Sequence, residues 1–205
     1  EASRCRELAI MVGKRFIEDD PEKVYAEPCI FTNFTNQEEA GTYMVVNDMA
    51  KLKKKLEEKL HEYTELFSIM DLVLFENAVM HVTRIARILQ FPGGNALLVG
   101  VGGSGKQSLS KLAAFICGYD AVQISVTSDF SVNDFKENLR EMYKKAGVKP
   151  GLPLMFLLTD SQITDERFLV YINDLLSSGR IPDLFTNEEY DGIFAGLRNV
   201  AKSEG

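Results

Sequence analysis

The sequence is poor in cysteine and histidine, the residues that most often mark disulfides and transition-metal sites. Its three cysteines, Cys5, Cys29 and Cys117, are odd in number and lack the spacing of metal ligands. This favours free thiols in a reducing compartment. His61 and His81 have no cysteine or carboxylate at ligand spacing, so we expect ordinary surface or interface histidines.

An excess of positive charge and a long apolar run are also missing. The chain has 23 basic and 30 acidic residues, a formal net charge of −7, which argues against a broad nucleic-acid surface. Its apolar runs are much shorter than the roughly 20 residues of a membrane-spanning helix, and its start lacks a basic-then-apolar signal pattern. We therefore expect no nucleic-acid partner, no membrane partner and an intracellular location.

The overall composition is that of a globular protein. Of the 205 residues, 45% are hydrophobic and 26% charged, which is enough to build a core. Because the chain begins at Glu1 and ends abruptly after Lys202–Gly205, we interpret it as a piece of a longer protein.

What the sequence does contain is a glycine-rich loop between a strand pattern and a helix pattern. The apolar run Leu97–Val99 leads into G-V-G-G-S-G-K, and apolar residues then recur at helical spacing from Leu109 to Ile116. Such a loop turns successive backbone N–H groups toward one centre, where the helix N-terminus adds partial positive charge. We predict that nucleotide phosphates bind to Gly100, Val101, Gly102, Gly103, Ser104, Gly105, Lys106, Gln107 and Ser108.

Within this loop, Lys106 and Gln107 suggest different capacities for phosphate and for metal. Lys106 supplies a full positive charge to the β- and γ-phosphates, and completes the pattern G-x-x-x-x-G-K. The next position normally carries a Ser or Thr whose hydroxyl helps to hold Mg²⁺, but here it is Gln107, with Ser108 one step later. We therefore expect the loop to bind nucleotide better than it handles metal.

Helix and strand patterns alternate after the loop, which predicts a doubly wound α/β fold. Helix patterns cover residues 4–17, 47–67, 75–89, 131–146 and 165–177, and strand patterns cover 97–99, 121–126 and 154–158. Thr127–Asp129 is expected to cap the helix that starts near Ser131. Met70, Met80 and Met155 are expected to fill the core.

The second half of a nucleotide-hydrolysing site requires acidic groups at the end of a neighbouring strand. The strand 154–158 ends in Thr159-Asp160-Ser161, which offers a single carboxylate. Either Asp160 lies on the metal side with Ser161 in the position of the base, or Thr159 lies on the metal side with Asp160 in the position of the base. One carboxylate is missing in both cases, so we expect slow or absent turnover. Asp165 and Glu166 are interpreted as residues that start a helix.

Four motifs together resemble the dynein heavy chains, and in particular their fourth AAA+ module of axonemal (ciliary) type. They are L-V-L-F-E-N-A-V-M-H-V-T-R-I-A-R-I-L, the loop G-V-G-G-S-G-K-Q-S-L-S, F-L-L-T-D-S-Q-I and I-N-D-L-L-S-S-G-R-I-P-D-L-F. The resemblance extends from about Tyr25 to the end of the chain.

This resemblance implies the large subdomain of a P-loop NTPase (AAA+): a mostly parallel sheet with helices on both faces, without its lid subdomain. Residues 1–22 would be the helical tail of the preceding module and residues 23–205 the nucleotide-binding large subdomain. The implied ligand is ATP or ADP with Mg²⁺ possible. Asp160 would face magnesium or water, and Val73, Leu74 and Phe75 would approach the adenine, although core packing explains that apolar segment equally well.

The family also implies partners and a location. The module would contact neighbouring AAA+ modules of the same chain, and the full-length motor would bind microtubules and dynein intermediate and light chains in the cilium axoneme. Two alternatives remain: a structural ring segment whose loop holds no nucleotide, and an independent P-loop ATPase or kinase.

Overall fold

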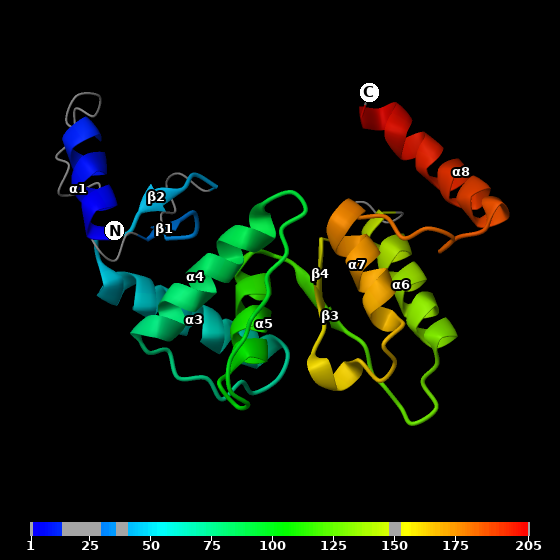
Figure 1. Cartoon of the computed structure of the whole chain (residues 1–205), viewed down its shortest axis with the longest axis horizontal. Coiled ribbons are helices and arrows are strands. Elements are labelled where there is room, and N and C mark those ends of the chain that lie inside the picture. Colours follow the sequence, from blue (N-terminus) through cyan, green and yellow to red (C-terminus); the bar gives the residue numbers. More distant parts are fainter. Residues whose placement is uncertain (1, 14–29, 36–40, 148–152, 205) are drawn as a thin grey trace.

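The fold is described by a computed structural model that covers residues 2–13, 30–35, 41–147 and 153–204. Helices dominate, and the two long terminal helices extend from opposite ends of the body (Figure 1). The helices are α1 (Ala2–Gly13), α3 (Met49–Leu66), α4 (Glu76–Gln90), α5 (Lys106–Ile116), α6 (Val132–Gly147), α7 (Phe168–Ser178), α8 (Asn187–Glu204) and the 3-10 helix η1 (Asp160–Gln162). The strands are β1 (Phe31–Thr32), β2 (Met44–Val45), β3 (Asp120–Gln123) and β4 (Leu154–Leu157).

The strands of the described residues form two small sheets. β1 and β2 pair in antiparallel orientation, whereas β3 and β4 pair in parallel, with Asp120 opposite Leu154 and Gln123 opposite Leu157. The predicted mixture of helices and parallel strands is therefore present. The larger, mostly parallel sheet with helices on both faces is not, because only β3 and β4 form a parallel ladder within the part of the chain that the structure describes.

The strand predicted at Leu97–Val99 is not formed, although its side chains alternate as in a strand. Leu97 and Val99 are 90% and 88% exposed, while Leu98 packs against the core between them. A strand needs a neighbouring backbone to satisfy its N–H and C=O groups. β3 and β4 pair with each other, and no strand of the described residues pairs with this segment.

A first hydrophobic core joins α3, α4 and α5, and it positions the glycine loop. Along α3, Leu52 and Leu56 are fully buried and Leu60 is partly buried, which confirms the predicted apolar stripe. The buried residues of this first core are Ile30, Leu52, Leu56, Leu74, Ala78, Val79, Val82, Ile85, Ala86, Leu109, Leu112 and Ala113. Because α5 enters this core within its first turn, at Leu109, the loop before it is held against a rigid helix.

A second hydrophobic core joins α6, α7 and the sheet. Its buried residues are Ile124, Phe135, Leu139, Phe168, Ile181 and Leu184. Phe135 and Phe168 stack at its centre with ring centroids 4.3 Å apart. The segment after α7 is tied to α6 by two hydrogen bonds: the Tyr143 hydroxyl donates to the Gly179 carbonyl, and Arg140 Nε donates to the Leu184 carbonyl.

The hairpin of β1 and β2 was not predicted, and it packs at the end of α4. The amide oxygen of Gln90 accepts hydrogen bonds from Tyr43 and from Asn33, the second at 2.9 Å. α1 confirms the first part of the helix predicted at 4–17, whereas residues 14–17 lie outside the described residues, as does Cys29. The apolar residues Leu8, Met11 and Val12 of α1 are about half exposed.

No helix among the described residues is long and apolar enough to cross a membrane. The boundary expected at residue 22 falls in the stretch that the structure does not describe, so it stays a prediction.

Candidate functional site: a glycine loop beside a strand end

The glycine loop, residues 100–105, runs into the N-terminus of α5, as the sequence predicts. Gly103 and Gly105 have φ angles of +72° and +75°, in the left-handed region that other residues rarely adopt. Gly105 is the N-cap of α5 and provides no side-chain cap. The first N–H groups of α5 therefore have no acceptor within the helix or from a capping side chain. These are the groups that bind anions at helix N-termini.

Lys106 folds back over the loop that precedes it. Its Nζ donates hydrogen bonds to the carbonyls of Gly100 and Val101, at 2.8 and 2.7 Å, and to Ser104 Oγ at 3.2 Å. These contacts place the ammonium group inside the curve of the loop, where it reinforces the positive potential of the helix N-terminus. A phosphate that enters the loop would compete with the two carbonyls for this ammonium group.

Gln107 is exposed in the first turn of α5 and links that turn to the sheet. Gln123 Nε2, at the end of β3, donates a long hydrogen bond of 3.4 Å to Gln107 Oε1. The contact brings the carboxyl end of β3 next to the start of α5. Because Gln123 lies opposite Leu157 in the parallel ladder, the end of β4 lies at the same edge of the sheet.

The end of β4 is fixed by a hydrogen-bonded cap. The Gln162 amide oxygen accepts from the Thr159 backbone N–H and hydroxyl, at 2.8 and 3.0 Å, and its Nε2 donates to the Ile124 carbonyl. Asp160 is the first residue of η1, and its side chain is exposed. The structure thus presents one exposed carboxylate just beyond the strand end, at the edge where α5 begins.

The segment expected near the adenine, residues 73–75, is partly buried in the first core and partly exposed. Leu74 is 3% exposed and belongs to the first core, so for this residue core packing is the interpretation that the structure supports. Val73 and Phe75 are 74% and 58% exposed. The segment does approach the loop, because the Cδ1 atom of Leu72 lies in van der Waals range of the position that a Cβ of Gly105 would take.

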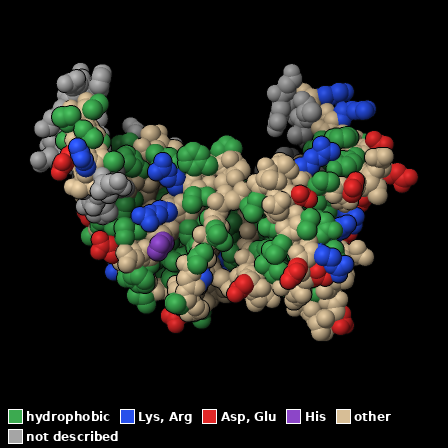
Figure 2. Space-filling view, viewed as in Figure 1, with side chains coloured by type: hydrophobic (Ala, Val, Ile, Leu, Met, Phe, Trp, Pro, Cys, Tyr) green, Lys and Arg blue, Asp and Glu red, His purple; other side chains and the backbone are tan. Residues whose placement is uncertain are grey.

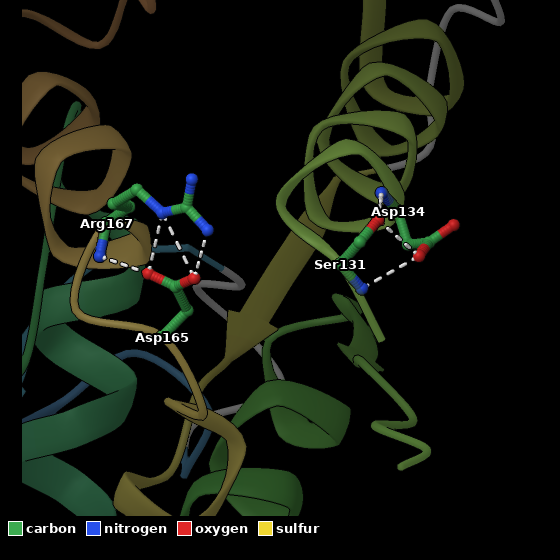
Figure 3. A network of polar contacts seen from close by, with 4 residues as sticks. All are labelled: Ser131, Asp134, Asp165 and Arg167. Carbon is green, nitrogen blue, oxygen red and sulfur yellow. Dashed lines mark hydrogen bonds and ion pairs between the residues drawn. The ribbon is translucent and has the colours of Figure 1, made fainter. Parts of the chain in front are cut away.

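The acids Asp165 and Glu166 lie before α7, and the Asp165 side chain contacts Arg167 within the turn that precedes this helix (Figure 3). Asp165 accepts hydrogen bonds from the Arg167 backbone N–H and guanidinium group. These bonds lower the pKa of the Asp165 carboxyl to about 2. α7 itself has no side-chain cap and no acid in its first turn, so Asp165 orders the turn before the helix and does not cap the helix.

The prediction that Thr127–Asp129 cap the helix after β3 is wrong. Ser131 and Asp134 form the cap of α6 instead: the Ser131 backbone N–H and hydroxyl donate to the Asp134 carboxylate, and the Asp134 N–H donates to Ser131 Oγ (Figure 3). The reason is spacing, since a capping hydroxyl and an acid three residues later satisfy two helix-terminal donors reciprocally.

Charged side chains of both signs are interspersed over the visible face of the molecule (Figure 2). His61 and His81 are exposed, as expected. Within the described ranges, no three His, Cys, Asp or Glu side chains are grouped so that they could hold a metal ion.

Two residues of this site, Gln123 and Gln162, were not predicted. Gln162 carries a detectable signal, because Thr159-x-x-Gln162 has the spacing of a capping box. Gln123 has no local signal, since its contact with Gln107 depends on how α5 packs against the sheet.

A glycine loop followed by a lysine at a helix N-terminus is typical of P-loop proteins. The family described as "P-loop containing dynein motor region D4" matches residues 70–205. The chain therefore belongs to the dynein heavy chains of axonemal type, and its residues 70–205 match their D4 motor region.

The relatives support the same assignment over nearly the whole chain. The sequence is 51% identical to "Dynein beta chain, flagellar outer arm" of Chlamydomonas reinhardtii over 100% of this chain and 5% of the relative. It is 50% identical to "Dynein axonemal heavy chain 11" of Sus scrofa over 94% of this chain and 4% of the relative. It is 47% identical to "Dynein beta chain, ciliary" of Tripneustes gratilla over 97% of this chain and 4% of the relative. The chain thus spans only about a twentieth of these proteins.

Proposed function

We propose that this chain is a nucleotide-binding module of a ciliary dynein heavy chain, which holds ATP or ADP and hydrolyses it slowly or not at all. The observation that carries the proposal is the arrangement of the glycine loop, with Gly103 and Gly105 in the left-handed conformation and the Lys106 ammonium inside the curve. Backbone N–H groups and one lysine are the usual ligands of nucleotide phosphates.

Weak hydrolysis is supported by the presence of a single acid at the strand end. Asp160 is the one carboxylate in the turn Thr159–Ser161, it is exposed, and the Thr159 hydroxyl is bonded to Gln162. Phosphoryl transfer requires a positioned group that orients the attacking water. Misplacement by about 1 Å costs on the order of a hundredfold in rate.

In the full-length motor, the module would act through its neighbours. Bound nucleotide would order this region and influence the adjoining AAA+ modules of the same chain, and the whole heavy chain would work on microtubules, with intermediate and light chains, in the cilium axoneme. The family and the names of the flagellar and ciliary relatives support this proposal.

Nucleotide binding is tested by thermal and urea denaturation of the chain with and without ATP or ADP. Ligand at one hundred times its Kd is expected to stabilise the folded state by about 2.7 kcal/mol. The control is Lys106→Ala, which should keep the circular dichroism spectrum and lose the stabilisation. No shift at millimolar nucleotide would refute the proposal.

That negative result would favour a second candidate, a structural segment that holds no nucleotide. The contacts of the Lys106 ammonium with the loop's own carbonyls are the observation in its favour, because they close the loop without a ligand. Hydrolysis is tested separately by phosphate release from the intact motor, with and without Lys106→Ala. Rapid turnover assigned to this site would refute slow hydrolysis.

A further inference from the structure

The first turn of α5 lacks the hydroxyl that commonly helps a P-loop hold Mg²⁺. The residue after Lys106 is Gln107, and its amide oxygen accepts a hydrogen bond from Gln123 at 3.4 Å. This oxygen is therefore directed to the end of β3. P-loops commonly use a Ser or Thr hydroxyl here as a magnesium ligand.

Gln107 differs from the usual serine in side-chain length as well as in chemical group. A serine hydroxyl is bonded directly to Cβ, whereas the amide oxygen of Gln107 is separated from its Cβ by two further carbons. Mg²⁺ requires near-ideal octahedral geometry with oxygen ligands at about 2.0–2.1 Å, and it loses its water reluctantly. A ligand displaced by two bonds, and already paired with Gln123, does not fit that requirement.

The site also offers a single acidic ligand, the smallest number that such a metal site uses. Mg²⁺ in nucleotide sites is usually held by one or two carboxylates together with the phosphates. Asp160 is the single acid of its turn and is exposed in η1. The residues at this site therefore do not fit a magnesium ion.

The groups that fit phosphate are independent of metal. The N–H groups at the start of α5 and the Lys106 ammonium supply positive potential directly to an anion. We propose that this site binds a nucleoside di- or triphosphate without requiring a divalent cation, and that Gln107 is the residue that sets this preference. The inference rests on the proposed nucleotide binding.

The test is equilibrium binding of a fluorescent ADP and of a fluorescent ATP to the 205-residue chain, in millimolar Mg²⁺ and in EDTA. For the parent chain, the two Kd values should agree within about twofold. Gln107→Ser restores the hydroxyl, and it should bind about tenfold more tightly in Mg²⁺ than in EDTA, a change of about 1.4 kcal/mol. Gln107 is exposed, so this substitution should leave the circular dichroism spectrum unchanged.

Gln107→Ala is the matched control, because it removes the Gln107 amide without adding a metal-binding hydroxyl. It should bind nucleotide as independently of Mg²⁺ as the parent does. A second measurement uses Mn²⁺ in place of Mg²⁺ and detects the bound ion by electron paramagnetic resonance. Mn²⁺ should be held about tenfold more tightly by nucleotide bound to Gln107→Ser than by free nucleotide, and no more tightly by nucleotide bound to the parent than by free nucleotide.

The outcomes separate the two proposals. If the parent bound nucleotide about tenfold more tightly in Mg²⁺ than in EDTA, metal independence would be overturned. The proposed function would still stand. Metal-independent binding by Gln107→Ser, or metal dependence in Gln107→Ala, would overturn the assignment to Gln107. An absence of binding in both conditions would overturn the proposed function, and this inference with it.

Discussion

At the scale of single residues, Gln162 holds the strand end in place with one side chain. It is 8% exposed, and its amide connects Thr159 to the backbone carbonyl of Ile124. Because the Ile124 carbonyl lies just after β3, this amide ties the end of β4 to the neighbouring chain segment. The position of Asp160, two residues earlier, therefore depends on a buried polar residue.

We expect Gln162→Leu to destabilise the chain by about 2 kcal/mol, because a buried polar group that loses its partner costs about 1–3 kcal/mol. Urea unfolding measures this change. Ser161→Ala is the control, since Ser161 is exposed and its hydroxyl contacts only Thr159 Oγ1 among the described side chains; it should change stability by less than about 0.5 kcal/mol. Equal effects of the two substitutions would contradict this role for Gln162.

The interaction between Asp165 and Arg167 can be measured through the pKa of the Asp165 carboxyl. Hydrogen bonds from the Arg167 side chain, and then from its backbone N–H, lower the pKa of Asp165 to about 2. In Arg167→Ala the backbone hydrogen bond remains, so the pKa should rise but stay below that of an ordinary aspartate. A carbon-detected NMR titration of the Asp165 carboxyl measures it, with Arg180→Ala as the control that leaves it unchanged.

The sign of the pH dependence follows from the lowered pKa. Asp165 binds its proton less readily in the folded chain than in the unfolded chain. Its stabilising contribution is therefore present above the unfolded pKa and is lost as the pH falls through about 2. If Arg167→Ala left the pKa of Asp165 at about 2, the guanidinium group would not be its main cause.

At the scale of elements, the sequence predicts helices better than it predicts the sheet. The apolar positions of α3 and α5 repeat within a single segment, so the buried residues Leu52, Leu56 and Leu112 could be identified without knowing what covers them. A strand depends on a partner segment that its own sequence does not specify. The alternation at Leu97–Val99 was recognised, but its pairing was not predictable.

The candidate site also has a part that the sequence predicts and a part that it does not. The glycine loop and Lys106 are contiguous in sequence and could be predicted from it. The contacts of Gln107 with Gln123, and of Gln162 with Ile124, join segments that are distant in sequence, so they depend on packing. The exposure of Val73 beside the buried Leu74 likewise depends on which side of the segment meets α4 and α5.

The segment 97–99 yields a test with an internal control. Leu97 and Val99 are almost fully exposed, so Leu97→Thr with Val99→Thr should change the free energy of unfolding by less than about 0.5 kcal/mol. The pair should also reduce self-association, measured by sedimentation, because exposed apolar strand-like segments pair between molecules. Leu98→Thr faces the core and should destabilise the chain by about 1–3 kcal/mol. Comparable destabilisation by both variants would contradict the described orientation.

At the scale of the whole molecule, the two hydrophobic cores belong to different parts of the chain. The first core is built by α3, α4 and α5, and the second by α6, α7 and the segment that follows them (Figure 1). The β3–β4 pair lies between them, with α5 packed against it. Local stability in proteins commonly follows such units, each of which can open by itself. The loop and α5 depend on the first core, whereas the turn that carries Asp160 lies next to the second.

We therefore expect substitutions in the two cores to act on different helices. Phe168 is fully buried and stacked on Phe135, so Phe168→Ala should cost about 3–5 kcal/mol and accelerate amide hydrogen exchange in α6 and α7. The matched substitution Leu112→Ala, also at a fully buried position, should cost about 2–5 kcal/mol and accelerate exchange in α4 and α5. If either variant accelerated exchange equally in all four helices, the two cores would open as one cooperative unit. In that case, nucleotide bound at the loop would slow hydrogen exchange in α6 and α7 as strongly as in α5. If the two cores open separately, bound nucleotide would slow exchange mainly in α4 and α5.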